Sequence, residues 1–165
     1  MFDFKPDPTL APAERYRELH NAADALTKDE PDTIANMANL AALIWEFIPD
    51  LNWAGFYRLG KSANGLDELV LGPFIGRPAC IRIPLGQGVC GVAAQSGRTQ
   101  LIDDVHAFPG HIACDAASRS ELVVPVLRDG QAIAVIDLDS PDLARFDKDD
   151  AAGIEQLADL ITDRI

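Results

Sequence analysis

Two strand-like segments that flank the dipeptide Asp129-Gly130 constrain the fold of this chain most. Residues 121–127 and 131–139 are rich in apolar and β-branched side chains, and an Asp-Gly pair favours the tight turn of a β-hairpin. Pro125 lies inside the first segment. Because proline has no backbone N–H to donate, it indicates an edge position or a bulge there. The chain is therefore expected to contain an antiparallel sheet.

Apolar residues at helical spacing predict helices on both sides of this sheet region. Asp32 and Asp147 are expected to be N-caps of the second and the last helix. Shorter apolar stretches predict further strands, and a glycine loop over 86–94 is expected to enter a short helix closed by Gly97. The predicted strands besides the hairpin cover residues 52–59, 68–71, 79–83 and 99–102.

This order of elements predicts an α+β fold with a central antiparallel sheet flanked by helices. We expect a single domain over residues 1–165, because a chain of this length suits one hydrophobic core. Its parts are a helical N-terminal segment over 13–48, a sheet with an active-site loop over 52–139, and a C-terminal helix over 147–163.

The charge balance argues against several classes of partner. The sequence has 26 acidic and 14 basic residues, which gives a net charge of -12. Such a surface repels phosphate backbones and anionic lipid, so neither nucleic acid nor a membrane is expected as a partner. The N-terminus lacks a basic region followed by an apolar stretch, and no apolar run approaches the ~20 residues of a membrane helix. The expected location is the cytoplasm, where thiols stay reduced.

The three cysteines, Cys80, Cys90 and Cys114, do not form a recognisable scaffold. An odd number without a CxxC pair argues against a disulfide framework and against a zinc ribbon, and no other metal or cofactor motif is present. A free cysteine is often only a small buried apolar residue. Cys114 differs because it lies in a long polar loop near His106 and His111. That setting fits a reactive thiolate, and it also fits a loop whose histidines cap turns.

Alternation along the strand 131–139 places Val135, Asp137 and Asp139 on one face and only apolar residues on the other. Two carboxylates on one face are costly to bury without partners. Either this face meets water, or it lines a polar pocket. Glu121, on the neighbouring hairpin strand, can point into the same pocket.

Several blocks of the sequence resemble the free methionine-(R)-sulfoxide reductases. The blocks are RPACIRIP, GVCG, GHIACDAASRSE, NWAGFYRL and AVIDLDSP, and together they cover roughly residues 50–147. The resemblance implies a GAF-type domain that reduces free L-methionine (R)-S-oxide to L-methionine without a cofactor. Thioredoxin is the reductant that it implies. The sequence departs from the family pattern at Ala134 and Ala144, where glycine is usual, and at Gln87, where a basic residue is common.

The resemblance also implies roles for individual residues. Cys114 matches the nucleophile and Cys80 the resolving cysteine, so a Cys80–Cys114 disulfide is expected after turnover. Cys90 matches a third cysteine with a supporting or alternative resolving role. The acidic substrate-binding and catalytic positions are matched by Glu121, Asp137 and Asp139, and the pocket aromatics by Trp53 and Tyr57.

The chemistry of a free amino acid adds a further expectation. Backbone N–H groups at Gly86 and Gly88, where a helix starts, are candidates for binding the substrate carboxylate, while Asp137 is placed near its ammonium. The alternative to catalysis is a GAF domain that binds a small ligand or only senses oxidation. A homodimer is compatible with the sequence and is left open.

Overall fold

The computed structural model describes residues 6, 7, 9–110 and 116–165. These residues form a six-stranded sheet in the order β3-β2-β1-β6-β5-β4, in which every neighbouring pair is antiparallel. The elements are α1 (Pro12–Thr27), α2 (Thr33–Phe47), β1 (Trp53–Lys61), β2 (Asp67–Gly76), β3 (Arg82–Pro84), α3 (Gly88–Ser96), β4 (Gln100–Ile102), the 3-10 turn η1 (Val105–Ala107), β5 (Ser120–Arg128), β6 (Gln131–Ser140) and α4 (Lys148–Ile161). The predicted α+β class, with a central antiparallel sheet flanked by helices, is confirmed.

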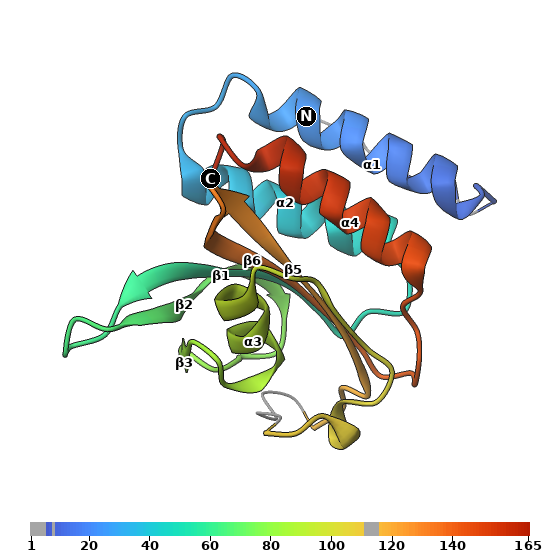
Figure 1. Ribbon diagram of the computed structural model, residues 1–165. Helices are drawn as coiled ribbons and strands as arrows, with labels where there is room; N and C mark the ends of the chain where they lie inside the picture. The colour runs from blue at the N-terminus through green and yellow to red at the C-terminus, as the bar shows by residue number, and fades with distance from the viewer. Residues whose placement is uncertain (1–5, 8, 111–115) are drawn as a thin grey trace.

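The sheet separates two unequal layers of helices (Figure 1). Helices α2 and α4 pack on one face, and α1 lies on top of both. The short helix α3 covers the opposite face, where it contacts β5 and β6. In the described part of the chain, no helix combines the length and the apolar character that crossing a bilayer requires.

The predicted hairpin is present. Asp129 and Gly130 both have positive φ angles, 52° and 77°, as a type I′ turn requires. Pro125 pairs with Val135 on β6, but β4 pairs with β5 only as far as Val123. No residue of β4 therefore lies opposite Pro125 to require a backbone N–H from it. Proline, which lacks that N–H, is tolerated at such a position in a strand.

Strand β2 is longer than predicted. The expected strand ended at residue 71 because Gly72 and Pro73 are strand breakers. The structure continues the strand to Gly76 by placing these two residues opposite the single residue Phe56, between the pairs Tyr57↔Leu71 and Gly55↔Phe74. This bulge brings Phe74 onto the sheet, a position that the sequence analysis missed.

Strand β3 is shorter than predicted and begins three residues later, at Arg82 instead of Ala79. The preceding residues do not run in the ladder, although the carbonyl of Ile81 accepts a hydrogen bond from Leu71 N–H at 2.9 Å. The strand prediction over 79–83 is therefore wrong for its first three residues. Cys80 lies in the irregular segment before β3 and not in a strand.

The helix boundaries follow the predicted capping residues. Asp32 accepts a hydrogen bond from the N–H of Ala35, and Asp147 forms a reciprocal capping box with Asp150. Gly97 ends α3 in the left-handed conformation with φ 64°. Ala144, before α4, also has a positive φ of 49°. A Cβ atom makes this conformation costly, and glycine would adopt it without that cost.

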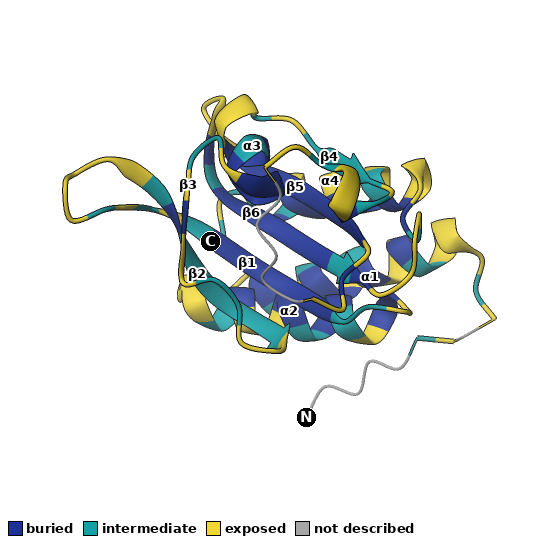
Figure 2. Ribbon diagram, turned by 90° about the horizontal axis from the view of Figure 1, so that it is seen from below, coloured by how far each residue is buried: buried dark blue, intermediate teal, exposed yellow. Residues whose placement is uncertain are grey.

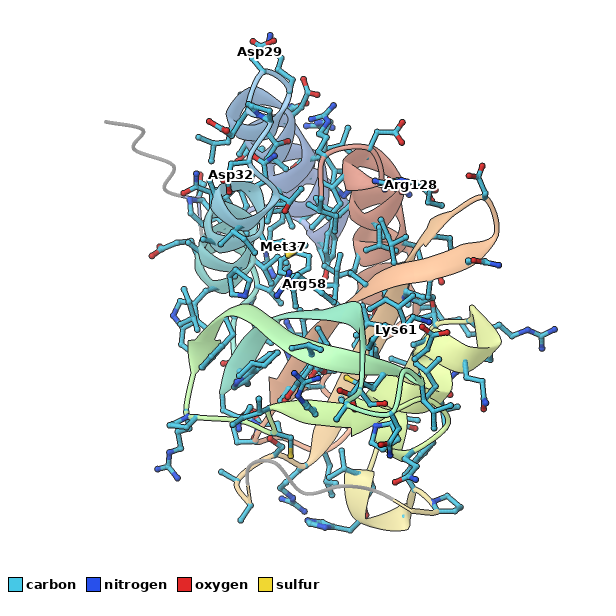
Figure 3. All side chains as sticks on the ribbon, turned by 90° about the vertical axis from the view of Figure 1, so that its left-hand side faces the viewer. Asp29, Asp32, Met37, Arg58, Lys61 and Arg128 are labelled. Carbon is cyan, nitrogen blue, oxygen red and sulfur yellow. The ribbon has the colours of Figure 1, made fainter. Side chains whose placement is uncertain are left out.

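Strands β1, β5 and β6 are buried along much of their length (Figure 2), and the two faces of the sheet contribute different side chains to two clusters. On the side of α2 and α4, the core is apolar and includes Leu122, Ile136 and Leu138, each fully buried. Figure 3 shows Met37 of α2 at the boundary between this helical layer and the sheet. On the side of α3, a second cluster mixes apolar residues with aromatic, thiol and acidic groups.

Candidate active site

The acidic residues of β5 and β6 that were predicted to share one face of the sheet lie on the face beneath α3. The ladder pairs Glu121 of β5 with Asp139 of β6, and Asp139 in turn with Trp53 of β1. Asp137 is two residues away from Asp139 on the same face. Because α3 covers this face, Asp137 and Glu121 are each only 6% exposed. Around Glu121 and Asp137 this face therefore lines a buried polar site, and Asp139 beside them is half-buried.

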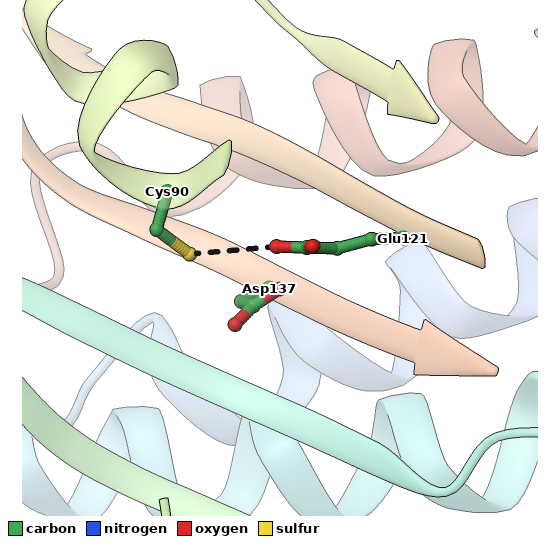
Figure 4. A group of neighbouring side chains, drawn as sticks. All are labelled: Cys90, Glu121 and Asp137. Atoms are coloured by element: carbon green, nitrogen blue, oxygen red, sulfur yellow. Dashed lines mark hydrogen bonds between the residues drawn. The ribbon is translucent and has the colours of Figure 1, made fainter. Parts of the chain in front are cut away.

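A thiol and two carboxyl groups meet at the centre of this site (Figure 4). Cys90 of α3, Glu121 and Asp137 each offer one ligand atom within 4.8 Å of the others. The Cys90 thiol donates to Glu121 Oε1 with a sulfur–oxygen distance of 4.0 Å. All three residues are buried, and Cys90 is a free cysteine. These donor types are able to hold protons or a cation.

Burial and mutual repulsion hold protons in the cluster at neutral pH. Loss of solvent and the nearby Asp137 charge raise the pKa of Glu121 well above its usual range. Burial also raises the pKa of Asp137, to about 7, although hydrogen bonds from Cys90 and Glu121 oppose this shift. Glu121 is thus the protonated partner that donates to Asp137. The site stores a proton next to a thiol.

The same environment keeps the Cys90 sulfur neutral. Burial, followed by the charges of Asp137 and Glu121, raises the pKa of its thiol well above the usual value. A thiol in this state is a weak nucleophile, because the thiolate is the reactive form. The geometry therefore does not favour Cys90 as the attacking group.

An aromatic wall closes one side of the site. Trp53 stacks on Tyr57 at a centroid distance of 5.8 Å and on Phe74 at 5.2 Å. The indole N–H of Trp53 donates to the carbonyl of Arg77 at 3.2 Å, which fixes the ring. Gly76 makes room for it, since a Cβ atom there would lie 2.7 Å from Trp53 Cδ1. Trp53 and Tyr57 thus lie where the sequence placed pocket aromatics, and Phe74 joins them.

Comparison with known proteins identifies the family. A GAF domain model matches residues 35–165. Free methionine-R-sulfoxide reductase of Escherichia coli is 49% identical over 87% of this chain and 84% of its own length. The protein of the same name from Saccharomyces cerevisiae is 43% identical over 90% of this chain and 84% of its own. This chain belongs to the free methionine-R-sulfoxide reductase family.

A solved member of the family supports the same conclusion. The X-ray structure of free methionine-R-sulfoxide reductase from Neisseria meningitidis, in complex with its substrate, superimposes with a TM-score of 0.90. It is 44% identical, and the match covers 99% of this chain and 95% of that one. The resemblance seen in the sequence is confirmed, and the chain is an oxidoreductase of this family.

The three cysteines that the family pattern singles out have different surroundings. Cys90 is the buried free thiol described above. Cys80 is half-buried, packs against the apolar residues of the site and takes part in a disulfide. Cys114 lies outside the described residues, as does His111, so the proposed nucleophile is not placed. His106 is exposed on η1.

The two glycines expected to bind a carboxylate are not equivalent. Gly86 and Gly88 both have positive φ, 79° and 61°. However, the N–H of Gly86 donates to the carbonyl of Gly91 at 2.8 Å and is already occupied. Gly88 begins α3, and N–H groups of a first helical turn have no partner within the helix. Of the two, only Gly88 is retained as a carboxylate-binding candidate.

Proposed function

We propose that this protein reduces free L-methionine (R)-S-oxide to L-methionine with its own thiols and is recycled by thioredoxin. The observation that carries this proposal is the protonated Glu121–Asp137 pair, buried beside a free thiol in a member of this reductase family. The site combines what the reaction needs: a proton source, shielding from water and an aromatic wall.

Reduction of a sulfoxide first requires its oxygen to become a better leaving group. Glu121 is the proposed proton donor, because its raised pKa keeps a transferable proton at neutral pH. Asp139 is half-buried at the neighbouring ladder position and is the alternative donor. The thiolate of Cys114 attacks the sulfoxide sulfur, and the oxygen moves to the cysteine as a sulfenic acid. Methionine is released with its sulfur reduced by two electrons.

A second thiol then resolves the sulfenic acid. Cys80 condenses with Cys114, forms a disulfide and releases water. The disulfide-bonded state of Cys80 and the free state of Cys90 support this division of labour. Two thiols of thioredoxin reduce the disulfide by exchange and become oxidised themselves. This reductant places the proposed reaction in the cytoplasm.

The charges of the free amino acid fit the groups around the pair. Among the described residues, Asp137 Oδ1 is buried and has no hydrogen-bond partner. A substrate ammonium supplies the missing donor and a compensating charge. Gly88 N–H is proposed to bind the carboxylate, and Trp53 to pack against the S-methyl group. A methionine within a polypeptide lacks both terminal charges and is expected to be rejected.

The test is turnover of racemic free methionine sulfoxide with dithiothreitol, followed by chiral chromatography. The proposal expects consumption of the R epimer alone, so that half of the material remains as the S form. N-acetylated methionine sulfoxide amide is expected to react at least about 10⁴-fold more slowly, because it leaves the polar groups of the site unpaired. Binding of the sulfoxide without reduction would instead indicate a non-catalytic sensor.

Cysteine variants test the assigned thiol steps. Cys114→Ser is expected to release no methionine in a single turnover of the reduced protein. Cys80→Ser is expected to retain that single turnover but to lose recycling by thioredoxin. Methionine release by Cys114→Ser contradicts the nucleophile assignment, and full thioredoxin-dependent turnover by Cys80→Ser contradicts the resolving step.

A further inference from the structure

Three side chains of the buried site form a donor set for a metal cation. Cys90, Glu121 and Asp137 come from α3, β5 and β6, yet their ligand atoms all lie within 4.8 Å of one another. Figure 4 shows the thiol and both carboxyl groups converging on one region. Asp137 Oδ1 is buried without a hydrogen-bond partner among the described residues, so one acceptor of the set is unused.

We propose that Cys90, Glu121 and Asp137 form a binding site for a divalent cation that prefers thiolate, Zn²⁺ in particular, and that the bound cation blocks the active site. The inhibitory part of this inference rests on the proposed function. The binding part rests only on the donor set.

The donor atoms suit Zn²⁺ in type and charge. On binding, the cation displaces the protons held by the Cys90 thiol and the two carboxyl groups, and these protons are released to solvent. The resulting thiolate and two carboxylates carry three negative charges, which more than balance the cation. A tetrahedral zinc site has Zn–S near ~2.3 Å and Zn–O near ~2.1 Å, and catalytic sites use three protein ligands with a fourth position open. Rotation of the long Glu121 side chain is the simplest way to contract the present spacing. The thiolate favours Zn²⁺ over Mg²⁺ and Ca²⁺, which prefer oxygen ligands alone.

Cation binding and catalysis exclude each other at this site. The cation takes the position proposed for the substrate ammonium at Asp137. It also replaces the proton that Glu121 is proposed to donate. Binding therefore removes a substrate contact and the acid at once, so inhibition should be competitive with methionine sulfoxide.

The direct test is titration of the fully reduced, metal-free chain with Co²⁺, a spectroscopic substitute for Zn²⁺. A thiolate ligand is reported by a sulfur-to-cobalt charge-transfer band in the near ultraviolet. The matched control is the double variant Cys80→Ser/Cys114→Ser, which retains only Cys90. We expect the band in the wild-type chain and in the double variant. In Cys90→Ser the band should be absent and Zn²⁺ affinity at least about 100-fold weaker, since even outer-shell changes cost 10–100-fold.

Each outcome decides the inference. A band that persists in Cys90→Ser, or that is missing from the double variant, overturns the site. Asp137→Asn gives a second test: the band should remain while affinity falls, and unchanged affinity excludes Asp137 as a ligand. Circular dichroism checks that each variant is folded.

Single-turnover reduction with and without Zn²⁺ separates this inference from the proposed function. Methionine formation without the metal and its competitive loss with the metal support both. Methionine formation that Zn²⁺ does not affect overturns only the inhibition. A cobalt band in a protein that never makes methionine supports the metal site and contradicts the proposed function.

Discussion

The two faces of the central sheet bury different kinds of side chain. Along β5 and β6, residues that alternate by one position face either the helical layer or the site. Leu122 and Leu138 pack into an apolar core, whereas their direct neighbours Glu121 and Asp137 lie beneath α3 with a thiol. Because neighbouring residues of a strand point to opposite faces, residues that stabilise the core alternate with residues of the site. A register slip of one residue would exchange them.

The energetic roles of the faces are opposite. Each fully buried Leu or Ile on the helical side stabilises the fold by about 1.5–3 kcal/mol relative to exposure. On the other side, buried carboxyl groups cost stability unless protons or partners neutralise them. The apolar face offsets that cost. Substitutions on the two faces should therefore separate activity from stability.

Replacing Glu121 should give the largest effect. Glu121→Gln keeps the size of the side chain but removes the transferable proton, so single-turnover rate should fall by about 10²–10⁴-fold. The free energy of unfolding should stay the same or rise, because a buried ionisable group is gone. Rapid-quench measurement of methionine release, together with denaturant unfolding, checks both.

Leu122→Met is the matched control on the same strand. Leu122 is fully buried on the opposite face, and this nearly volume-conserving change should cost less than about 1.5 kcal/mol. Its rate should equal that of the wild type. A rate loss comparable to that of Glu121→Gln would show that the two faces are not functionally separate.

Truncating a side chain on the face that packs against α2 and α4 should lower stability and leave the reaction rate nearly unchanged. Leu138 has 0% exposure in the apolar core, so Leu138→Ala should lower the free energy of unfolding by about 2–5 kcal/mol. The single-turnover rate of the folded fraction should change little. Urea unfolding and rate measurement well below the melting temperature test this, and a large rate loss in folded protein would contradict the separation.

Asp137→Asn should show how much stability is lost by burying the Asp137 carboxyl group, through the pH dependence of the free energy of unfolding. The pKa of Asp137 rises from its ordinary 3.8 to about 7 on folding. A raised folded pKa gives stability that is fully present below pH 3.8 and is lost as the pH rises towards 7. The stability of Asp137→Asn relative to wild type should therefore increase across this window and level off above it. Unfolding at a series of pH values measures the difference, which would be constant if Asp137 were ionised throughout.

The smallest effect is expected outside both faces, in the connection to α4. Ala144 has a φ of 49°, and a non-glycine residue pays roughly 1–2 kcal/mol there. Replacing Ala144 with glycine removes this strain, but part of the gain in stability is lost because glycine has more conformational freedom in the unfolded chain. Ala144→Gly should thus raise the melting temperature by a few degrees at an unchanged rate. A lower melting temperature would show that the strain is absent.

Local signals predicted much of this architecture from the sequence. The Asp129-Gly130 turn and the caps at Asp32 and Asp147 depend on nearby residues, and each is present. The path of β2 across Gly72 and Pro73 could not be predicted, because the bulge depends on pairing with β1. Phe74 was missed for the same reason.

The nature of the site was harder to predict than its composition. The alternation of residues along the strand placed Asp137 and Asp139 on one face, but it could not show whether that face is exposed to solvent or lines a pocket. That choice depends on α3, a distant segment that covers the face. The occupied N–H of Gly86 is likewise a consequence of the folded loop. Sequence identified the groups, and tertiary packing determined their protonation.

The central claim is that the face beneath α3 stores protons at neutral pH. Carboxyl ¹³C chemical shifts of Glu121 and Asp137, followed through a pH titration of the reduced protein, test it most directly. We predict that Asp137 titrates near pH 7 and that Glu121 remains protonated well above its usual range. If both carboxyl groups are fully ionised at pH 5, the site stores no proton and the account is wrong.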